Sequence, residues 1–341
     1  MNNYILIIVS AFISIIATPL VKRFAVRIKA IDVPKDERRV HKKPIPLLGG
    51  LGIYISFIIT LLLKEGVAKN SELGIIIGAT IIVIGGVLDD IKDLKPSIKL
   101  LFQIAAATAL IISGIKINIL TNPFGGIDGM IDIRWFSIPF TLFWVVGITN
   151  ALNLIDGLDG LAAGVALISS LTILVIALLH GRNEAAVLTA ILCGAILGFL
   201  PYNFNPASIF MGDTGAQLLG FLLAAISMEG TIKSAAAFAI SVPILALGLP
   251  IYDTLFAMIR RKVNGKPISQ GDKGHLHHRL LDIGLSQREA VIVMYFISAI
   301  LGGIAIIAMQ ISTVRSYFLM ASVITIIVFV AWKIGFFEHK E

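Results

Sequence analysis

The stretch from Leu73 to Asp90, LGIIIGATIIVIGGVLDD, decides the fold class of this chain. Its first sixteen residues carry no charge, and a helix needs about 20 mostly apolar residues to cross a bilayer. The run then ends in two adjacent acids, Asp89 and Asp90. This pattern predicts a membrane-spanning helix that brings two carboxylates to one surface of the membrane.

The composition extends this prediction to the whole chain. Of its 341 residues, 57% are hydrophobic and 14% are charged, and the mean hydropathy is +0.92. A soluble domain carries about a quarter charged residues and a disordered chain has low hydrophobicity, so both classes are excluded. The single cysteine, Cys193, lies in an apolar run, which excludes a disulfide framework and a thiolate metal site. We predict an all-α polytopic membrane protein with one integral-membrane domain, 1–341.

Eleven apolar segments are close to the length that a membrane span requires. Basic residues follow the first segment rather than precede it, so we expect a retained span and not a signal peptide. The predicted spans are 4–21, 47–63, 73–88, 100–116, 135–152, 161–180, 185–202, 214–229, 235–257, 290–309 and 316–335. The segment 118–134, between the fourth and fifth spans, is predicted to form a small hairpin.

The basic residues set the orientation of these spans. Twenty-one Lys and Arg residues fall after the odd-numbered spans or in the C-terminal tail, and 7 fall on the other side. An excess of positive charge marks the cytoplasmic face, so we expect the N-terminus outside and the C-terminus in the cytoplasm. This distribution explains the net charge of +7 without a nucleic-acid partner. The cytoplasmic loops expected to carry the activity are about 22–46, 89–99, 153–160, 203–213 and 258–289.

Acidic residues gather on the same side of the membrane. The connectors after spans 5 and 7 contain Asp residues but no Lys or Arg, so a bound divalent cation is the expected counter-charge. Asp89 and Asp90 stand at a helix C-terminus, which carries partial negative charge and favours cations. Two acids in this unfavourable position indicate a function rather than a solvated helix end.

The connector after span 5 reads NALNLIDGLDGL from Asn150 to Leu161. Asp159 is placed to cap the following helix, but one cap does not account for Asn150, Asn153 and Asp156 as well. Carboxamide and carboxylate groups suit hydrogen bonding to a nucleobase and a ribose. We therefore predict a nucleotide-binding segment.

The connector after span 7 reads YNFNPASIFMGDTG from Tyr202 to Gly215. Either Asp213 or Thr214 is placed to cap the next helix. Asp213 is, however, the third acidic site that reaches the cytoplasmic surface from a separate pair of spans. Carboxylates that converge in this way are typical of a site for Mg²⁺ or Mn²⁺, whose coordination shell substrate phosphates complete.

The long connector after span 9 contains the sequence GHLHHRL, with His275, His277, His278 and Arg279. A zinc site is one alternative, although structural zinc usually needs four ligands in spaced pairs. A loop that only binds anionic lipid headgroups is another. The imidazoles and the guanidinium fit better as donors to phosphate and sugar oxygens.

Two further features remain open at this point. Lys42 and Lys43, in the first cytoplasmic loop, either face a phosphate or serve membrane orientation. Asp253 lies near the cytoplasmic end of span 9, where an acid is a functional candidate. It is also placed to pair with Arg260 or Arg261 further along the helix.

Together these motifs resemble the polyprenyl-phosphate N-acetylhexosamine-1-phosphate transferases over nearly the whole chain. The markers are the Asp89-Asp90 pair, NLIDGLDG, FMGDTG and HLHH, in this order and all on one side of the membrane. The resemblance implies transfer of a sugar phosphate from a UDP-sugar to a polyprenyl phosphate lipid. An Asp carboxylate would act there either as a general base or as a covalent nucleophile.

The resemblance also implies roles for individual residues. Asp213 would be the main Mg²⁺ ligand, with Asp89 and Asp90 at the metal and at the attacking lipid phosphate. Further residues would bind substrate. Relatives place a lysine three residues after the acidic pair, where this chain has Asp93, so Lys92 or Lys95 would have to replace it. The implied substrate-binding residues are Asn153 and Asp156 for uridine, Asn203 and Phe210 in the same pocket, and either Lys42 or Lys43 in the first loop.

The resemblance separates two branches of the family. Eleven spans and HLHH are similar to the branch that uses plain UDP-N-acetylglucosamine, with undecaprenyl phosphate as the lipid, in the bacterial cytoplasmic membrane. The alternative is the phospho-MurNAc-pentapeptide transferase branch, which has ten spans and three consecutive histidines. A secondary transporter is the alternative from another class of protein. A transporter would be expected to have acidic residues at the bilayer midplane and inverted repeats, whereas the acids of this chain gather at one interface. The sequence leaves open whether the protein forms a homodimer.

Overall fold

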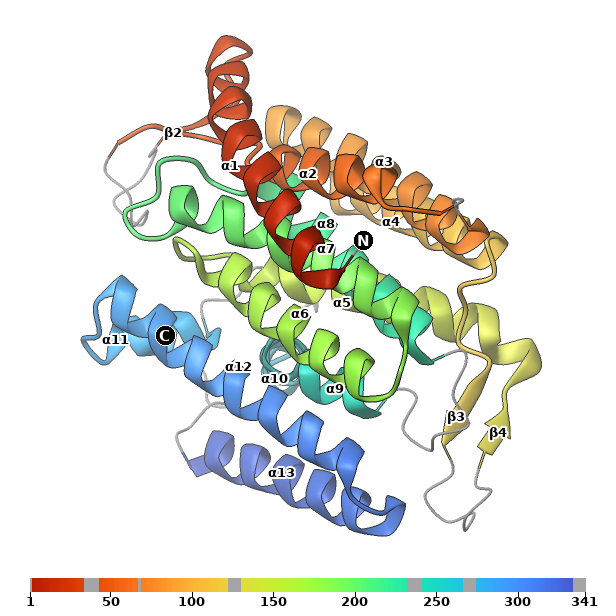
Figure 1. Ribbon diagram of the computed structural model, residues 1–341. Helices are drawn as coiled ribbons and strands as arrows, with labels where there is room; N and C mark the ends of the chain where they lie inside the picture. Colours follow the sequence, from red (N-terminus) through yellow and green to blue (C-terminus); the bar gives the residue numbers. More distant parts are fainter. Residues whose placement is uncertain are drawn as a thin grey trace.

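The computed structural model of this protein describes residues 2–33, 43–66, 69–121, 130–231, 241–265 and 274–333, and these are almost entirely helical (Figure 1). Seven helical segments in this described part are long and apolar enough to cross a membrane. They confirm an all-α polytopic membrane protein. The seven are α1 (Asn3–Arg27), α3 (Asn70–Lys92), α5 (Ser137–Ile155) with the preceding turn η2 (Arg134–Phe136), α6 (Leu161–Leu179), α7 (Asn183–Asn203), α12 (Gln287–Gln310) and α13 (Thr313–Lys333).

The remaining helices are shorter or less apolar. Ten of the eleven predicted segments each overlap one helix, and the segment 235–257 overlaps two short helices that meet at Leu247. A continuous helix was expected there, and the interruption precedes the polar helix α10. These elements are α2 (Gly50–Leu63), α4 (Pro96–Ile112), α8 (Gly212–Thr231), α9 (Ser241–Ala246), α10 (Gly248–Val263) and α11 (Leu276–Asp282).

Helix α8 lies at the centre of the bundle. Its residues from Thr214 to Glu229 are all buried, and it packs against α2, α3, α5, α6 and α7. A helix that is covered on every side belongs to the interior of a large bundle. Five neighbours therefore hold α8 in place, and its first turn carries Asp213.

Small and hydroxyl-bearing residues hold the neighbouring helices close together. On α1, the Ser10 hydroxyl donates to the Ile191 carbonyl at 2.7 Å, and Ser14 donates to Ala195 at 2.7 Å. A Cβ added at Gly194 or Gly198 of α7 would overlap the backbone of α1. Close packing and polar contacts of this kind replace the hydrophobic effect between helices in a membrane.

Two small hairpins connect the helices. Strands β1 (Ile31–Asp32) and β2 (Ile45–Pro46) pair antiparallel in the first loop. Strands β3 (Ile119–Thr121) and β4 (Met130–Asp132) form the hairpin predicted between the fourth and fifth spans. After β2, the backbone pairs with the α7–α8 connector, where Phe210 N donates to Pro46 O and Gly49 N donates to Phe210 O, both at 2.9 Å. The first loop is thereby held against the start of α8.

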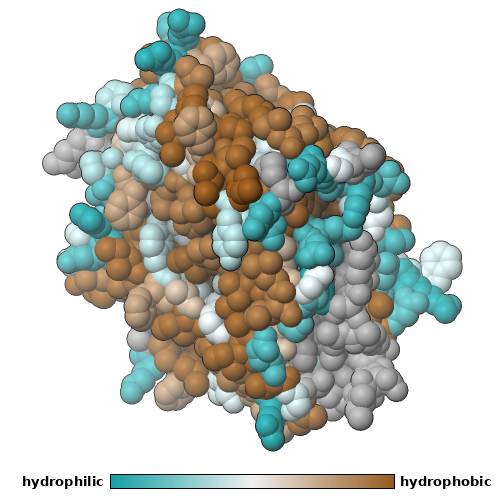
Figure 2. All heavy atoms as spheres, viewed as in Figure 1, coloured by the Kyte–Doolittle hydropathy of each residue, from teal (hydrophilic) through white to brown (hydrophobic). Residues whose placement is uncertain are grey.

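The surface agrees with a membrane environment. Hydrophobic residues dominate much of the face shown in Figure 2. Exposed large apolar side chains include Phe12 of α1, Phe296 of α12 and Phe318 of α13. Apolar surface on this scale is far above what a soluble monomer exposes, so lipid is its expected solvent.

The close approach of α3 and α8 provides a test of the packing. A Cβ added at Gly86 would overlap the Cα of Thr214, next to Asp213. We expect Gly86→Ala to destabilise the fold by about 1–3 kcal/mol, because the two backbones must separate. Thermal melting of the detergent-solubilised protein measures this effect. The matched control is Gly147→Ala on α5, where an added Cβ meets nothing within 4 Å; equal melting temperatures for the two variants would contradict the prediction.

Candidate active site

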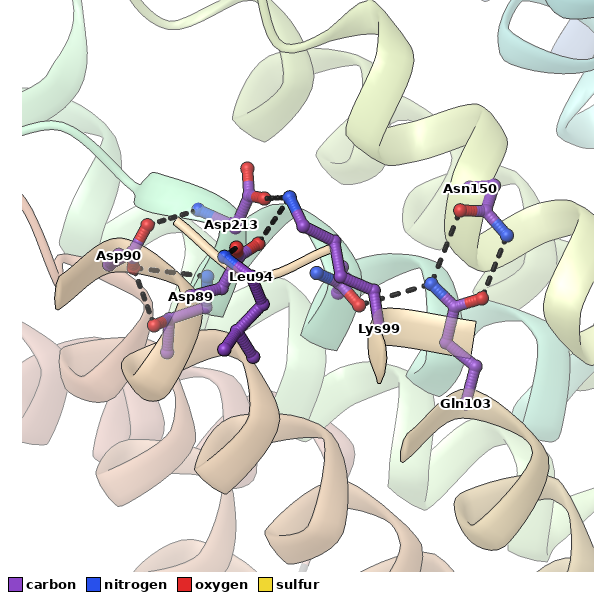
Figure 3. Close-up of polar contacts among 9 residues, drawn as sticks. Asp89, Asp90, Leu94, Lys99, Gln103, Asn150 and Asp213 are labelled. Atoms are coloured by element: carbon purple, nitrogen blue, oxygen red, sulfur yellow. Dashed lines mark hydrogen bonds and ion pairs between the residues drawn. The ribbon is translucent and has the colours of Figure 1, made fainter. Parts of the chain in front are cut away.

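An ion-pair cluster joins three helices at the N-terminus of α8 (Figure 3). The Lys99 ammonium of α4 lies 2.5 Å from Asp89 Oδ2 of α3 and 2.7 Å from Asp213 Oδ2 of α8. Asp89 is buried, whereas the side chains of Lys99 and Asp213 are 24% and 33% exposed. The cluster therefore opens on one side, where an anionic group can reach the ammonium.

Asp90 takes a different position from its neighbour. Its carboxylate accepts hydrogen bonds from Asp213 N at 2.8 Å, Thr214 N at 3.2 Å and the Thr214 hydroxyl at 2.6 Å. These amides begin α8, and the positive end of a helix dipole stabilises an acid there. Asp90, which lies on α3, therefore caps the N-terminus of α8. It takes the capping role that the sequence offered to Asp213 or Thr214. This contact also explains how α3 tolerates an acid at its own C-terminus.

Lys99 is the residue that sequence reasoning missed. The two lysines considered for this place, Lys92 and Lys95, are exposed. Lys99 lies one turn into α4, and its side chain points back to the end of α3 (Figure 3). Its one signal in the sequence is Gln103, four residues on, which continues a polar stripe along an otherwise apolar helix.

A buried amide network lies one turn deeper than Lys99. Gln103 Nε2 donates to Asn150 Oδ1 at 3.2 Å and to Gln217 Oε1 at 3.1 Å, and Asn150 Nδ2 donates to Gln103 Oε1 at 2.8 Å. These side chains come from α4, α5 and α8. Asn150, predicted to bind substrate, is therefore engaged in fixing the positions of the helices that carry the cluster.

The α5–α6 connector brings further polar groups to the cluster. Asn153 lies within hydrogen-bonding reach of Asp213, and its buried Oδ1 has no hydrogen-bond partner among the described residues. Burial of Asp156, followed by the charges of Asp213, Asp90 and Asp159, raises the pKa of that carboxyl above its usual range. A further negative charge on Asp156 is thus disfavoured beside the other carboxylates.

Asp159 and Asn203 brace the connectors on which they lie. Asp159 Oδ2 accepts from Asn205 Nδ2 and Ala207 N, both at 3.0 Å, and the helix cap position before α6 is Gly160. The capping alternative for Asp159 is therefore not seen. Asn203 Nδ2 donates to the Ile209 carbonyl at 3.1 Å and leaves its buried Oδ1 without a described partner.

The first loop meets the start of α8 through its backbone. Lys43 is exposed just before β2, and Lys42 lies outside the described residues. Phe210, in the α7–α8 connector, is linked to this loop through its backbone. The structure therefore joins the loop to the connector, and among the described residues Lys43 makes no ion pair with Asp89 or Asp213.

The histidines reach the site from α11. The ring of His277 packs directly over Gly157, between Asp156 and Asp159. Burial, together with the neighbouring His278 and His275 rings, lowers the pKa of His277 to about 3, so its ring is neutral. Its Nδ1 is buried without a hydrogen-bond partner among the described residues. Arg279 donates from Nε to the Gly274 carbonyl at 3.1 Å and fixes the start of the same helix.

A divalent cation fits this arrangement only if the substrate completes its coordination. In the described part of the chain, no three His, Cys, Asp or Glu side chains form a group that could hold a metal. Asp89 and Asp213 nevertheless share one cationic group, the Lys99 ammonium, and Asn153 offers an unpaired oxygen beside them. Mg²⁺ is commonly bound by one or two carboxylates together with substrate phosphates and water. The donor set is compatible with that mode.

Comparison with known proteins gives a consistent result. Residues 73–231 match the family model described as Glycosyl transferase family 4. Over 98% of its length the chain is 41% identical to a protein of Bacillus subtilis (strain 168) named probable undecaprenyl-phosphate N-acetylglucosaminyl 1-phosphate transferase, of which 92% is covered. It is 39% identical to a decaprenyl-phosphate N-acetylglucosaminephosphotransferase of Mycolicibacterium smegmatis, over 84% of this chain and 77% of the relative.

A second branch also matches, at lower identity. A phospho-N-acetylmuramoyl-pentapeptide-transferase of Staphylococcus saprophyticus is 32% identical over 88% of this chain and 97% of its own. Family membership identifies an enzyme, which removes the transporter alternative. The chain belongs to glycosyl transferase family 4, among the polyprenyl-phosphate N-acetylhexosamine-1-phosphate transferases, and is most like their undecaprenyl-phosphate N-acetylglucosamine-1-phosphate branch.

Proposed function

We propose that this enzyme transfers N-acetylglucosamine-1-phosphate from UDP-N-acetylglucosamine to undecaprenyl phosphate. The products are undecaprenyl-diphospho-N-acetylglucosamine and UMP, and the reaction begins the membrane stage of a cell-envelope polysaccharide pathway. The observation that carries the proposal is the cluster of Asp89, Lys99 and Asp213 in a chain whose Bacillus subtilis relative has this activity in its name.

The reaction joins two anions, so neutralising and positioning them accounts for most of the catalysis. An oxygen of the lipid phosphate forms a bond to the β-phosphorus of the UDP-sugar, and the bond from that phosphorus to the bridging oxygen breaks as UMP leaves. Lys99 neutralises phosphate oxygens at the open side of the cluster. Asp89 accepts the proton of the lipid phosphate, because its Oδ2 lies beside the Lys99 ammonium that would bind the phosphate, whereas Asp90 faces the amides of α8. The other oxygen of Asp89 accepts from Leu94 N at 2.8 Å, which fixes the carboxylate in place.

The other polar groups bind the donor. Asn153 and Asp156 hold the uridine, and His277 offers its unpaired Nδ1 to a phosphate or sugar group. Asp213 and Asp89 would hold a magnesium ion. When bound, Mg²⁺, or Mn²⁺ in its place, supplies charge neutralisation of the diphosphate and of the departing UMP.

The location follows from the substrates. A soluble sugar nucleotide and a membrane-bound polyprenyl chain meet at a membrane interface. The excess of Lys and Arg supports eleven spans with the N-terminus outside, the C-terminus inside and the site at the cytoplasmic face. The bacterial relatives support a place in the bacterial cytoplasmic membrane.

UMP release by the purified, detergent-solubilised protein tests the proposal. We expect release from UDP-N-acetylglucosamine only when both undecaprenyl phosphate and Mg²⁺ are present, and loss of release on addition of EDTA. Omission of the lipid is the matched control.

The identity to the Staphylococcus relative favours a second candidate, the muramyl-pentapeptide branch. Turnover of UDP-MurNAc-pentapeptide alone would establish that candidate, and no UMP from either donor would contradict the reaction.

A further inference from the structure

Asp253, on α10, is buried and makes two contacts with one short segment. Its Oδ2 lies 2.6 Å from His275 Nδ1, and its Oδ1 accepts from Leu276 N at 2.8 Å. Asp253 and His275 are each 4% exposed. The carboxylate therefore holds both the side chain of His275 and the first amide of α11, twenty-odd residues away in the sequence.

These contacts continue toward the active site. The ring of His275 is stacked with that of His277, with centroids 5.8 Å apart and an interplanar angle of 10°. His277 in turn packs on Gly157 of the α5–α6 connector. A chain of direct contacts thus runs from α10 through two imidazoles to the connector that carries Asn153 and Asp156.

We infer that Asp253 is a positioning residue of the transferase, which acts through His275 to set the place of His277 against the α5–α6 connector. This inference rests on the proposed function. Asp253 has no contact with the Asp89–Lys99–Asp213 cluster in its recorded hydrogen bonds or ion pairs among the described residues. Its contribution is therefore to the geometry of donor binding rather than to the reacting phosphates.

The chemistry of the contact fixes the state of His275. An ionised carboxylate can only accept hydrogen bonds, so Nδ1 of His275 carries the proton that points to Asp253. In Asp253→Asn, the amide oxygen can still accept from Leu276 N, but the amide nitrogen then donates to His275 Nδ1. The substitution keeps the shape and moves the ring proton to Nε2.

The test compares Asp253→Asn with Tyr252→Phe in the UMP-release assay. Tyr252 is the preceding residue on α10, and its hydroxyl is buried without a described partner, so its loss controls for removal of a polar atom from this helix. We expect Asp253→Asn to lower kcat/KM for the UDP-sugar about 10- to 100-fold, mainly through KM, because an outer contact orients a binding group. Asp253→Glu, which keeps the carboxylate, should recover part of the loss.

Two further measurements separate positioning from folding. If Asp253 acts through His275, the double variant Asp253→Asn/His275→Gln should lose no more activity than His275→Gln alone, since coupled residues are not additive. Nitrogen-15 NMR of labelled histidines, assigned with His275→Gln, should show the proton on Nδ1 in the wild type and on Nε2 in Asp253→Asn.

The outcomes are distinguishable. Full activity of Asp253→Asn, additive losses in the double variant, or an unchanged His275 tautomer would overturn the positioning role. A wild-type protein that releases no UMP would contradict the proposed function, and the NMR measurement alone would then decide the contact between Asp253 and His275. Should Asp253→Asn fail to fold, the comparison of His275→Gln with wild type still tests it, because a similar KM for both would exclude any action through His275.

Discussion

Asp213→Asn is expected to abolish UMP release, with kcat lowered by at least about 10³-fold. The change is nearly isosteric and removes the more exposed of the two carboxylates that contact Lys99. The backbone amide of Asp213, which donates to Asp90, is unaffected, so the start of α8 should remain in place. The loss should therefore appear in the rate and not in the melting temperature.

The control for Asp213→Asn is Asp132→Asn, the same chemical change at the exposed end of β4. Both variants should elute and melt as the wild type does, and Asp132→Asn should keep full activity. An Asp213→Asn enzyme that kept a tenth of the wild-type kcat would contradict a catalytic role for this carboxylate.

Lys99→Met is expected to lower kcat by about 10²-fold and to lower the stability of the protein by about 1–3 kcal/mol. Methionine retains the length of the side chain but removes the ammonium that Asp89 and Asp213 share. Breaking a buried pair is costly because it leaves uncompensated charge, and the partial exposure of Lys99 moderates the cost. Assays of UMP release and thermal melting measure the two effects.

A second substitution separates the two effects of Lys99. Asp89→Asn placed on the Lys99→Met background removes one of the carboxylates that are left facing each other. The melting temperature should recover, whereas the activity should not, because the ammonium that faces the phosphates and the carboxylate that accepts the proton are then both missing. Lys333→Met, at the exposed end of α13, is the matched control and should leave both unchanged. A double variant with restored activity would contradict the catalytic roles of both Lys99 and Asp89.

The sequence was sufficient to predict the class of fold and the gathering of the motifs. Apolar runs report membrane spans directly, and motifs placed on connectors of one side meet at one interface. The close packing of α8, by contrast, depends on which helix faces offer glycine, such as Gly86 against Thr214. A hydrophobic pattern that is uniform around each helix does not specify those pairings.

The details of the site depended on side-chain geometry that no spacing encodes. Asp89 and Asp90 are adjacent in the sequence, yet one faces Lys99 and the other caps α8, because successive helical residues point about 100° apart. Lys99 was missed since its partner residues come from two other helices. The sequence suggested Arg260 or Arg261, on the same helix, as the ion-pair partner of Asp253. The observed partner is His275, which caps a different helix, α11.

The surroundings of α8 bear on how the protein is made. The helices that enclose it, α2, α3, α5, α6 and α7, all precede it in the chain. A ribosome that has released Thr231 into the membrane has therefore already supplied these five helices, which are the main neighbours of α8 in the described part of the chain, together with Asp89, Lys99 and Asp213. The histidines arrive only with the later helix α11 and the residue that caps it. Biogenesis would thus complete the carboxylate half of the centre first and add the imidazole half to a finished scaffold.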